Sequence, residues 1–266
     1  YGCIENNVVT GGWRIIGIMN NVDDGTGNLE TRVKLIRNES LGTYSWDTNE
    51  NFGSLNWTQA DLQNELNGDY LNTTLTTNPY WYNGQNNQQT AVYNHLNGLK
   101  TSAQNLIDSA VWHLGELQHE YEYYDNPTTL EFYQAERGTS LFDEGDSTYK
   151  DCSTNTCSRP TTWTGKVAIP YPSDYLYAIG GSDRTSCLAA GPHDYSSYGC
   201  WDYDWLNKPD IDYWALTAHR YITNGFISVN QSPPSDPFAV FPTLYLKSSA
   251  AVASGDGSGA NPYVIE

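Results

Sequence analysis

The sequence predicts an α+β domain in which antiparallel sheets are flanked by helices and joined by long loops. Two apolar runs near the N-terminus, at 13–19 and 31–37, enclose an Asn-, Asp- and Gly-rich segment that is typical of a β-hairpin. Two later segments, 58–68 and 90–109, repeat apolar residues at helical spacing. Because no internal repeat, low-complexity linker or block of charge divides the chain, we expect one domain spanning residues 1–266. Three short β-type runs close the chain, at 214–217, 225–229 and 239–248.

The two strands of the N-terminal hairpin differ in pattern. Residues 13–19 are mostly apolar, which predicts a buried strand. Residues 31–37 alternate polar and apolar side chains, which predicts a strand with one exposed face. Residues 20–28 form the expected loop between them.

Each helical segment has one apolar face. Thr58 and Asp61 have the approximate spacing of a capping box, and Leu62, Leu66 and Tyr70 then recur on one side of the first helix. The second segment repeats this pattern with Val92, Leu96, Leu99, Leu106 and Ile107.

Between these helices and the final strands, short elements alternate with long loops. Loops this long inside a compact domain are uncommon and tend to be functional. The expected order is a strand at 110–115, a helix capped by Thr128 or Thr129 and running through Ala135, a loop at 138–160, a strand at 163–169, a helical turn begun by Pro172, Ser173 and Asp174, and a loop at 181–213.

The charge balance excludes several kinds of partner. The chain has 13 Lys and Arg residues against 31 Asp and Glu residues, for a net charge of −18. Such a surface repels phosphate backbones and anionic lipids. No apolar run approaches the roughly 20 residues of a membrane span. We therefore expect no nucleic-acid binding and no direct membrane insertion by this chain.

The aromatic content is high, with 21 Tyr and 9 Trp. Aromatic side chains fill cores, and on loops they offer flat surfaces that stack on sugars or on partner proteins. The densest aromatic run is interleaved with Asp202 and Asp204, and it is either a recognition surface or a loop that buries its own rings. Its aromatic members are Tyr195, Tyr198, Trp201, Tyr203 and Trp205.

The spacing of the cysteines predicts two disulfides. Cys152 and Cys157 lie in a polar loop, and Cys187 and Cys200 bracket a second loop, so we expect one bond within each pair. These bonds imply an oxidising compartment and hence an extracellular location. Cys3 is left over. A zinc site fits less well, because there is no Cys-x-x-Cys motif and no His at ligand spacing from a Cys.

Two acidic loops are candidate calcium sites, and calcium is the one cofactor that the sequence suggests. Asp23 and Asp24 lie in the first loop, and Asp143, Glu144 and Asp146 lie in the second. Carboxylate oxygens grouped over a short loop suit Ca²⁺. Neither loop has the EF-hand pattern, and turn formation explains the Asp-Gly and Glu-Gly steps equally well.

No catalytic motif is present. The chain lacks the G-x-S-x-G elbow, the phosphate-binding P-loop and a dinucleotide fingerprint in the right βαβ context, and its five His residues are dispersed. We therefore expect a protein that is not an enzyme.

A series of motifs covers nearly the whole chain. Together they resemble an uncharacterised domain family of bacterial cell-surface proteins, whose members often follow a prepilin-type N-terminal helix. The motifs begin Trp13-Arg-Ile-Ile-Gly, Tyr44-Ser-Trp-Asp, Asn56-Trp, Trp112-His-Leu-Gly, Trp163-Thr-Gly-Lys, Tyr171-Pro-Ser-Asp-Tyr, Asp204-Trp-Leu, Trp214-Ala-Leu-Thr and Leu244-Tyr-Leu-Lys-Ser.

The layout of the C-terminal part is similar to C-type lectin-like folds, a superfamily that includes the formylglycine-generating enzymes. The resemblance implies a C-type lectin-like domain in which the N- and C-terminal strands pair. The strand that contains Trp13 would then lie beside the strand that contains Leu244, and the long loops would form the binding face.

We therefore expect an extracellular recognition or adhesion module at the cell surface, in the context of a pilin or pilus-tip subunit. It would bind a glycan or a surface protein through loops at 193–213 and 219–237, where aromatic rings stack and amides form hydrogen bonds. Two alternatives stay open: a filament subunit whose partners are like subunits, and an oxidase of the formylglycine-generating type. The expected ligand-binding residues are Tyr203, Trp205, His219, Arg220, Tyr221, Asn224 and Asn230.

Overall fold

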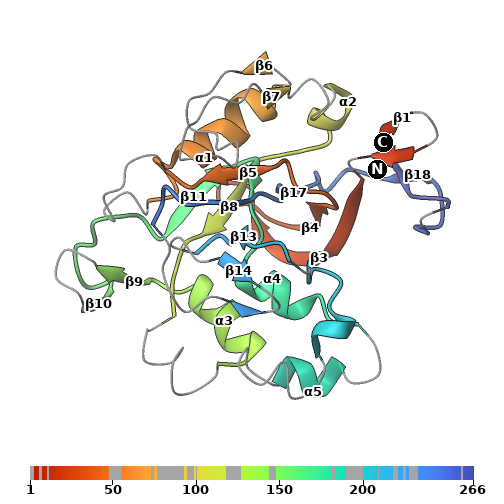
Figure 1. The fold of residues 1–266 in the computed structure, drawn as a ribbon. Helices are drawn as coiled ribbons and strands as arrows, with labels where there is room; N and C mark the ends of the chain where they lie inside the picture. Colours follow the sequence, from red (N-terminus) through yellow and green to blue (C-terminus); the bar gives the residue numbers. More distant parts are fainter. Residues whose placement is uncertain are drawn as a thin grey trace.

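The computed structural model is a mixed α+β structure with mostly antiparallel sheets and short helices. Helices α1 and α2 lie on one side of the sheets, and α3, α4 and α5 lie on the other (Figure 1). No helix of the described part is long and apolar enough to cross a bilayer. The described residues are 3–5, 8–10, 12–47, 56–72, 75–76, 93–94, 99, 101–117, 127–143, 148–180, 184–189, 200–208, 210–217, 221–223, 226–227, 233–258 and 260–266.

An antiparallel sheet of four strands contains the N-terminal hairpin, which the sequence predicts correctly. The expected pairing of the Trp13 strand with the Leu244 strand is wrong, because Leu244 lies opposite Leu35 on the second hairpin strand. A hairpin leaves one open edge on each strand, and the later strand β17 pairs along the edge of the second hairpin strand. In spatial order the strands are β12 (Val167–Ala168), β17 (Thr243–Tyr245), β4 (Leu29–Arg37) and β3 (Trp13–Asp23).

The burial of this hairpin is the reverse of the expected one. The predicted buried strand, β3, is an edge strand on which Ile15 is 45% and Ile18 is 69% exposed. Strand β4 alternates as predicted, but its buried face carries Arg32 and Lys34 together with Ile36. Alternation shows which residues share a face and leaves open which face meets the core.

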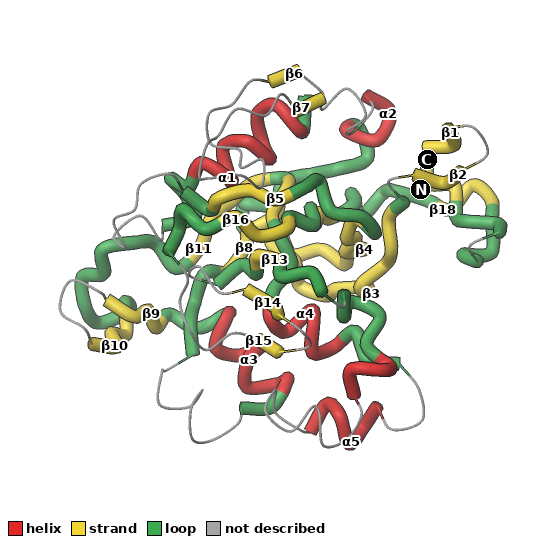
Figure 2. The backbone as a smooth tube through the Cα atoms, in the orientation of Figure 1, coloured by secondary structure: helices red, strands yellow, loops and turns green. Residues whose placement is uncertain are grey.

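A second sheet of five strands holds most of the predicted C-terminal runs (Figure 2). Trp214 Nε1 donates a hydrogen bond to the carbonyl of Tyr44 at 2.8 Å, which ties two of these strands together. The run at 239–248 is divided between the two sheets, because Pro242 has no N–H to donate to a strand ladder. In spatial order the strands are β15 (Phe226–Ile227), β14 (Tyr221–Thr223), β13 (Tyr213–Trp214), β16 (Pro237–Ala239) and β5 (Thr43–Ser45).

The predicted strand at 163–169 is also divided. Strand β11 (Thr162–Gly165) pairs with β8 (Ala110–His113), which confirms the strand expected from residue 110, and the chain then enters the four-stranded sheet as β12. Where β11 ends and β12 begins, the Asn67 side chain accepts a hydrogen bond from the N–H of Val167 at 3.0 Å. The same side chain donates a hydrogen bond to the carbonyl of Val167 at 2.8 Å. This pair of bonds fixes β12 to the helical segment that contains Asn67.

The first predicted helix is present in a different form. Helix α1 (Asp61–Glu65) continues as a π-helix, η2 (Leu66–Tyr70), and the predicted apolar face is buried. The predicted capping box is wrong, because Thr58 Oγ1 donates to the side chain of Asn56 at 2.7 Å and the residue that precedes α1 is Ala60. An Asn two residues before Thr58 competes for its hydroxyl.

Two other helix starts agree with the sequence. Thr128 caps α3 (Thr129–Glu136) through a capping box with Glu131, which was one of the two predicted caps. Helix α4 (Pro172–Tyr177) begins at the predicted Pro172, and the carboxylate of Asp174 accepts the N–H of Tyr171 at 2.8 Å.

Helix α2 (Thr101–Gln104) confirms part of the helix predicted at 90–109, and the predicted inward residues Leu99 and Ile107 are buried. Several other regions contain elements that the sequence did not predict. A β-hairpin lies in the expected loop at 138–160, two short helices lie at 181–213, and a two-residue strand lies in the expected helix at 90–109, where Val92 and Leu96 are outside the described residues. Such short elements leave little periodic signal in a sequence. They are β9 (Ser140–Asp143), β10 (Thr148–Asp151), α5 (Arg184–Ala189), η5 (Cys200–Tyr203) and β7 (Tyr93–Asn94).

Small hairpins complete the described chain. The last one contains the glycine-rich turn near the C-terminus, where Gly255 and Gly257 adopt φ values of 94° and 82° that side chains disfavour. Their strands are β1 (Cys3–Glu5) with β2 (Val8–Thr10), β6 (Leu75–Thr76) with β7, and β18 (Val252–Ser254) with β19 (Val264–Ile265).

Tryptophan and tyrosine fill the core. The ring of Trp46 lies 5.0 Å from that of Trp57 and 5.7 Å from that of Trp214, measured between centroids. All three side chains are buried, as are Trp112 and Tyr175. Much of the high aromatic content is therefore used in packing.

Both predicted disulfides are present. Cys152 and Cys157 close a loop that follows β10, and Cys187 and Cys200 join α5 to η5. Both cysteines of the second bond are fully buried. The second bond therefore anchors one of the predicted functional loops to the core.

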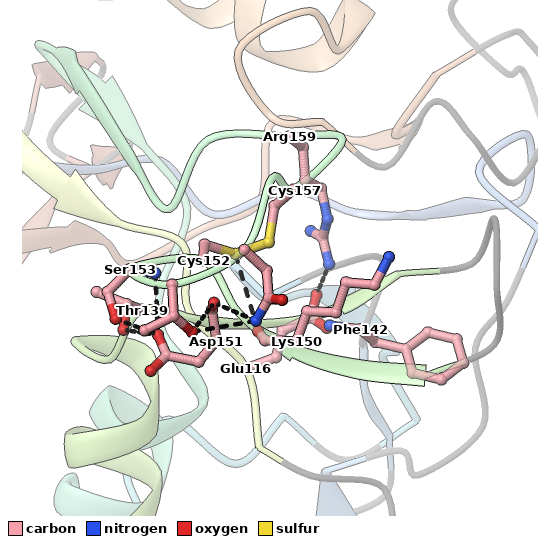
Figure 3. Close-up of a disulfide and its surroundings, with 11 residues drawn as sticks. Glu116, Thr139, Phe142, Lys150, Asp151, Cys152, Ser153, Cys157 and Arg159 are labelled. Atoms are coloured by element: carbon pink, nitrogen blue, oxygen red, sulfur yellow. Dashed lines mark hydrogen bonds and ion pairs between the residues drawn. A yellow bond between two sulfur atoms is a disulfide. The ribbon is translucent and has the colours of Figure 1, made fainter.

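Polar contacts support the first disulfide loop (Figure 3). Asp151 Oδ1 accepts hydrogen bonds from Thr139 Oγ1 at 2.8 Å and from the N–H of Ser153 at 3.0 Å. Nearby, Arg159 forms an ion pair with the buried Glu116. These contacts hold the loop against the strand–helix framework.

Replacing Cys187 and Cys200 together by Ala should lower the free energy of unfolding by about 3 kcal/mol, because the bond closes a loop of 13 residues. The bond between Cys152 and Cys157 closes a loop of only 5 residues. The matched replacement of both cysteines by Ala should therefore cost about 2 kcal/mol. Urea denaturation of both variants measures the difference. A larger loss for the shorter loop would contradict this ordering.

Candidate functional site

The predicted recognition face is described at two positions, Tyr203 and Trp205. Tyr203 ends η5 and is 50% exposed, while its carbonyl accepts the N–H of Gly180 at 2.9 Å. Cys200 fixes the other end of η5 through its disulfide. Trp205 is half-buried, and the guanidinium carbon of Arg14 lies 4.2 Å from its ring centroid. The face thus presents the ring of Tyr203 to solvent and holds the cation of Arg14 against the ring of Trp205.

Asp204 lies between these two rings and is 5% exposed. Its Oδ1 accepts the N–H of Leu206 at 2.8 Å, and its backbone carbonyl accepts the N–H of Asn207 at 3.1 Å. Its Oδ2 is buried and has no hydrogen-bond partner among the described residues. Burial raises the pKa of Asp204 to about 7, and the backbone N–H groups of Leu206 and Asn207, which face the carboxylate, oppose that rise.

Two cations lie near this face: Arg14 against the ring of Trp205, and Lys208, whose Nζ lies 5.9 Å from the ring centroid of Phe241. Burial lowers the pKa of Lys208, and the positive charge of Arg14 lowers it further, whereas the charge of Asp204 raises it. In the described part of the chain, Arg14 has no ion-pair partner. The local potential is therefore more positive than the net charge of −18 suggests.

The other predicted ligand-binding residues are only partly placed. Tyr221 begins β14, where its backbone lies opposite Trp214, and its side chain is outside the described part. The remaining residues of the prediction, His219, Arg220, Asn224 and Asn230, lie outside the described residues.

The first candidate calcium loop is held together by its own hydrogen bonds. Asp23 Oδ1 accepts the N–H groups of Gly25 at 2.8 Å and Gly27 at 3.1 Å, and Asp24 Oδ1 accepts the N–H of Thr26 at 2.7 Å. These carboxylates stabilise the turn.

The second candidate calcium loop is described only at the backbone of Asp143, which lies opposite Thr148. Glu144 and Asp146 lie outside the described residues. Among the residues that the structure describes, no three His, Cys, Asp or Glu side chains are grouped to hold a metal ion.

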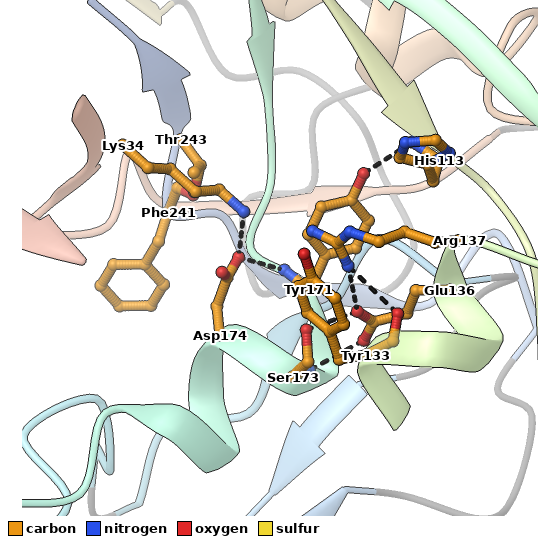
Figure 4. Close-up of polar contacts among 10 residues, drawn as sticks. All are labelled: Lys34, His113, Tyr133, Glu136, Arg137, Tyr171, Ser173, Asp174, Phe241 and Thr243. Atoms are coloured by element: carbon orange, nitrogen blue, oxygen red, sulfur yellow. Dashed lines mark hydrogen bonds and ion pairs between the residues drawn. The ribbon is translucent and has the colours of Figure 1, made fainter. Parts of the chain in front are cut away.

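A buried polar network, which the sequence did not predict, lies between β4 and α4 (Figure 4). Lys34 is 0% exposed, and its Nζ lies 2.5 Å from Asp174 Oδ2. The ammonium also lies 4.3 Å from the ring centroid of Tyr171 and 5.6 Å from that of Tyr245. Burial lowers the pKa of Lys34, whereas the charge of Asp174 raises it.

The network extends to the end of α3 through Glu136. The N–H of Ser173 donates to Glu136 Oε1 at 2.8 Å, and Arg137 lies 3.4 Å from Oε2. Burial raises the pKa of Glu136 to about 7, and the charge of Arg137 opposes that rise. The guanidinium carbon of Arg137 lies 3.5 Å from the ring centroid of Tyr133, which is 42% exposed. The network therefore approaches solvent at Arg137 and Tyr133.

His113 lies at the edge of the same network. The backbone N–H of His113 donates to the hydroxyl of Tyr171 at 2.7 Å. Burial, followed by the charge of Arg137, lowers the pKa of His113 to about 4. The imidazole is therefore neutral at neutral pH and adds no charge to the network.

The only sequence signal for this network was the alternation at 31–37. That pattern placed Lys34 with Arg32 on one face of the strand, and charged residues are rarely buried without a partner. The partner, Asp174, is 140 residues away in the chain. No local pattern connects the two.

Searches against protein-family models, curated proteins and solved structures find no match for this chain.

Replacing Asp204 by Asn should flatten the dependence of stability on pH. The folded protein holds a proton on Asp204 up to a pKa of about 7, well above the ordinary value of 3.8, so the folded state binds more protons than the unfolded state between these values. The free energy of unfolding must therefore fall as pH rises from about 4 to 7, by at most about 4 kcal/mol from this group. The Asn variant keeps the Oδ1 acceptor but has no carboxyl group to titrate. Its free energy of unfolding should therefore fall less between about pH 4 and pH 7 than that of the wild type.

Thermal denaturation from pH 4 to pH 8 measures the effect. Asp202→Asn is the matched control, because it removes the same charge from an exposed position two residues earlier. Parallel pH profiles for wild type and Asp204→Asn would contradict the assignment.

Proposed function

We propose that this chain is an extracellular recognition module with a C-type lectin-like fold, which binds a glycan or a surface protein at the face around Tyr203 and Trp205. The observation that carries the proposal is the presentation of Tyr203. Its ring is half exposed, whereas its backbone is fixed by the bond from Gly180 and by the disulfide at Cys200. A ring that is already positioned loses little conformational freedom on binding.

The charges of this face favour an anionic group on the ligand. Arg14 lies against Trp205 and is unpaired within the described ranges, and its charge lowers the pKa of Lys208. A carboxylate or sulfate of a ligand would relieve the repulsion between the two cations. The rest of the acidic surface would repel such ligands and so restrict them to this face.

The sequence resemblance supports a cell-surface context, in which the domain would be part of a pilin or pilus tip. The two disulfides fit an oxidising compartment. The pairing of Cys187 with Cys200 leaves neither as a free thiol, so we do not propose the oxidase alternative.

A filament subunit is the second candidate, and the edge strand β3 favours it. Within the described part of its sheet, β3 pairs only with β4, and it exposes Ile15 and Ile18. Exposed edge strands with apolar side chains are prone to pair with other chains. Electron microscopy of native material separates the candidates, since filaments with this domain packed laterally would support assembly and a free monomer would count against it.

The recognition proposal is tested by glycan and surface-protein arrays. Tyr203→Ala should weaken binding by about tenfold or more, because exposed aromatic anchors contribute at least about 1–2 kcal/mol at interfaces. Arg220→Ala tests the predicted loop at 219–237 in the same assay.

Tyr263→Ala is the matched control. Tyr263 is 36% exposed and lies next to β19, so its loss should leave binding unchanged. Absence of binding to any array component, or binding that survives Tyr203→Ala together with Arg220→Ala, would refute the recognition proposal.

A further inference from the structure

The contact between Lys34 and Asp174 joins two distant parts of the chain at a single pair of atoms. Lys34 is on β4 and Asp174 is on α4, 140 residues later. Nζ lies 2.5 Å from Oδ2, and the side chains are 0% and 5% exposed. The reacting groups of an amine and a carboxylic acid are thus held together away from solvent.

The surroundings of this pair are aromatic. The Lys34 nitrogen lies 4.3 Å from the ring centroid of Tyr171, 5.4 Å from that of Trp112 and 5.6 Å from that of Tyr245. These rings are themselves buried, so few water molecules can solvate the charges. A dry site disfavours the ammonium, so burial lowers the pKa of Lys34 and favours the neutral amine, which is the nucleophilic form.

Other groups of the network position the pair and have opposing effects on its charges. The N–H of Tyr171 donates to Asp174 Oδ2 at 2.8 Å, which orients the carboxyl group and polarises its C–O bond. Burial lowers the pKa of Lys34, and so does the charge of Arg137, while the charges of Asp174 and Glu136 raise it. The amine is held against the carboxyl group by its neighbours on β4 and α4, and such positioning is worth several orders of magnitude in rate.

We propose that Lys34 and Asp174 form an intramolecular isopeptide bond. A proton first moves from Nζ to Oδ2 along the existing hydrogen bond. The neutral amine then attacks Cγ, the bond between Cγ and Oδ2 breaks, and Oδ2 leaves as water with the two protons released by the nitrogen. One amide bond forms, one water molecule is lost, and no oxidant, nucleotide or metal is required.

The bond would connect the four-stranded sheet to α4 covalently. It would close a loop of 140 residues, which contains α1, α3 and both β8 and β11. A cross-link across so long a loop limits the unfolded chain more than either disulfide does. Unlike the disulfides, it would also survive reduction.

The intact mass of the purified full chain, reduced and denatured, decides the proposal. The expected mass is lower than that of the linear sequence by one water molecule, and fragmentation should show a branched peptide that joins Lys34 to Asp174. An unmodified mass for folded protein overturns the proposal. So does a water loss that maps to an Asp-Gly step such as Asp256-Gly257, where a succinimide forms instead.

Two variants complete the test. Lys34→Arg keeps a positive charge but should restore the full mass, whereas Lys150→Arg, in the β9–β10 hairpin, should retain the water loss. If Lys34→Arg does not fold, the branched peptide in the wild-type protein still decides the matter. Retention of the water loss in soluble Lys34→Arg would overturn the proposal.

Discussion

The ion pair between Lys34 and Asp174 sets the orientation of the main sheet. Lys34 must face inward to reach Asp174, and the alternation of β4 then turns Arg32 and Ile36 inward as well. On the neighbouring strand β3, Ile15 and Ile18 are left toward solvent, whereas Ile16 and Val22 are buried. Removing one partner of a buried pair costs about 3–5 kcal/mol, because the other charge remains desolvated. The pair therefore couples the sheet to α4, and through α4 to the rest of the network.

Local polar contacts and disulfides hold the loops around this frame. Carboxylates at Asp23, Asp151 and Asp204 accept backbone N–H groups a few residues further on, so acidic side chains act as turn stabilisers. The disulfide at Cys200 and the hydrogen bond to the Tyr203 carbonyl then fix the aromatic face. A rigid frame with fixed aromatic rings is suited to recognition, since the cost of ordering the site is met during folding.

Features that depend on neighbouring residues were predictable. The N-terminal hairpin, the capping of α3 by Thr128 and both disulfides follow from contacts within a few residues or across one short loop. The sheet partners were not predictable, since β17 pairs with β4 and not with β3. At the candidate site, the sequence indicated Tyr203 and Trp205 by their aromatic density. It gave no reason to place Arg14 against Trp205, because the two are far apart in the sequence.

The sequence by itself determined an acidic, aromatic-rich α+β domain, its disulfides and the periodicity of its strands. The tertiary structure decided which face of β4 is buried and which distant residues meet there. The physical reason is that periodicity is a local property, whereas burial depends on what packs against each face. For Lys34 the deciding partners are Asp174 and three aromatic rings from β8, β17 and the start of α4. Only the folded chain brings them together.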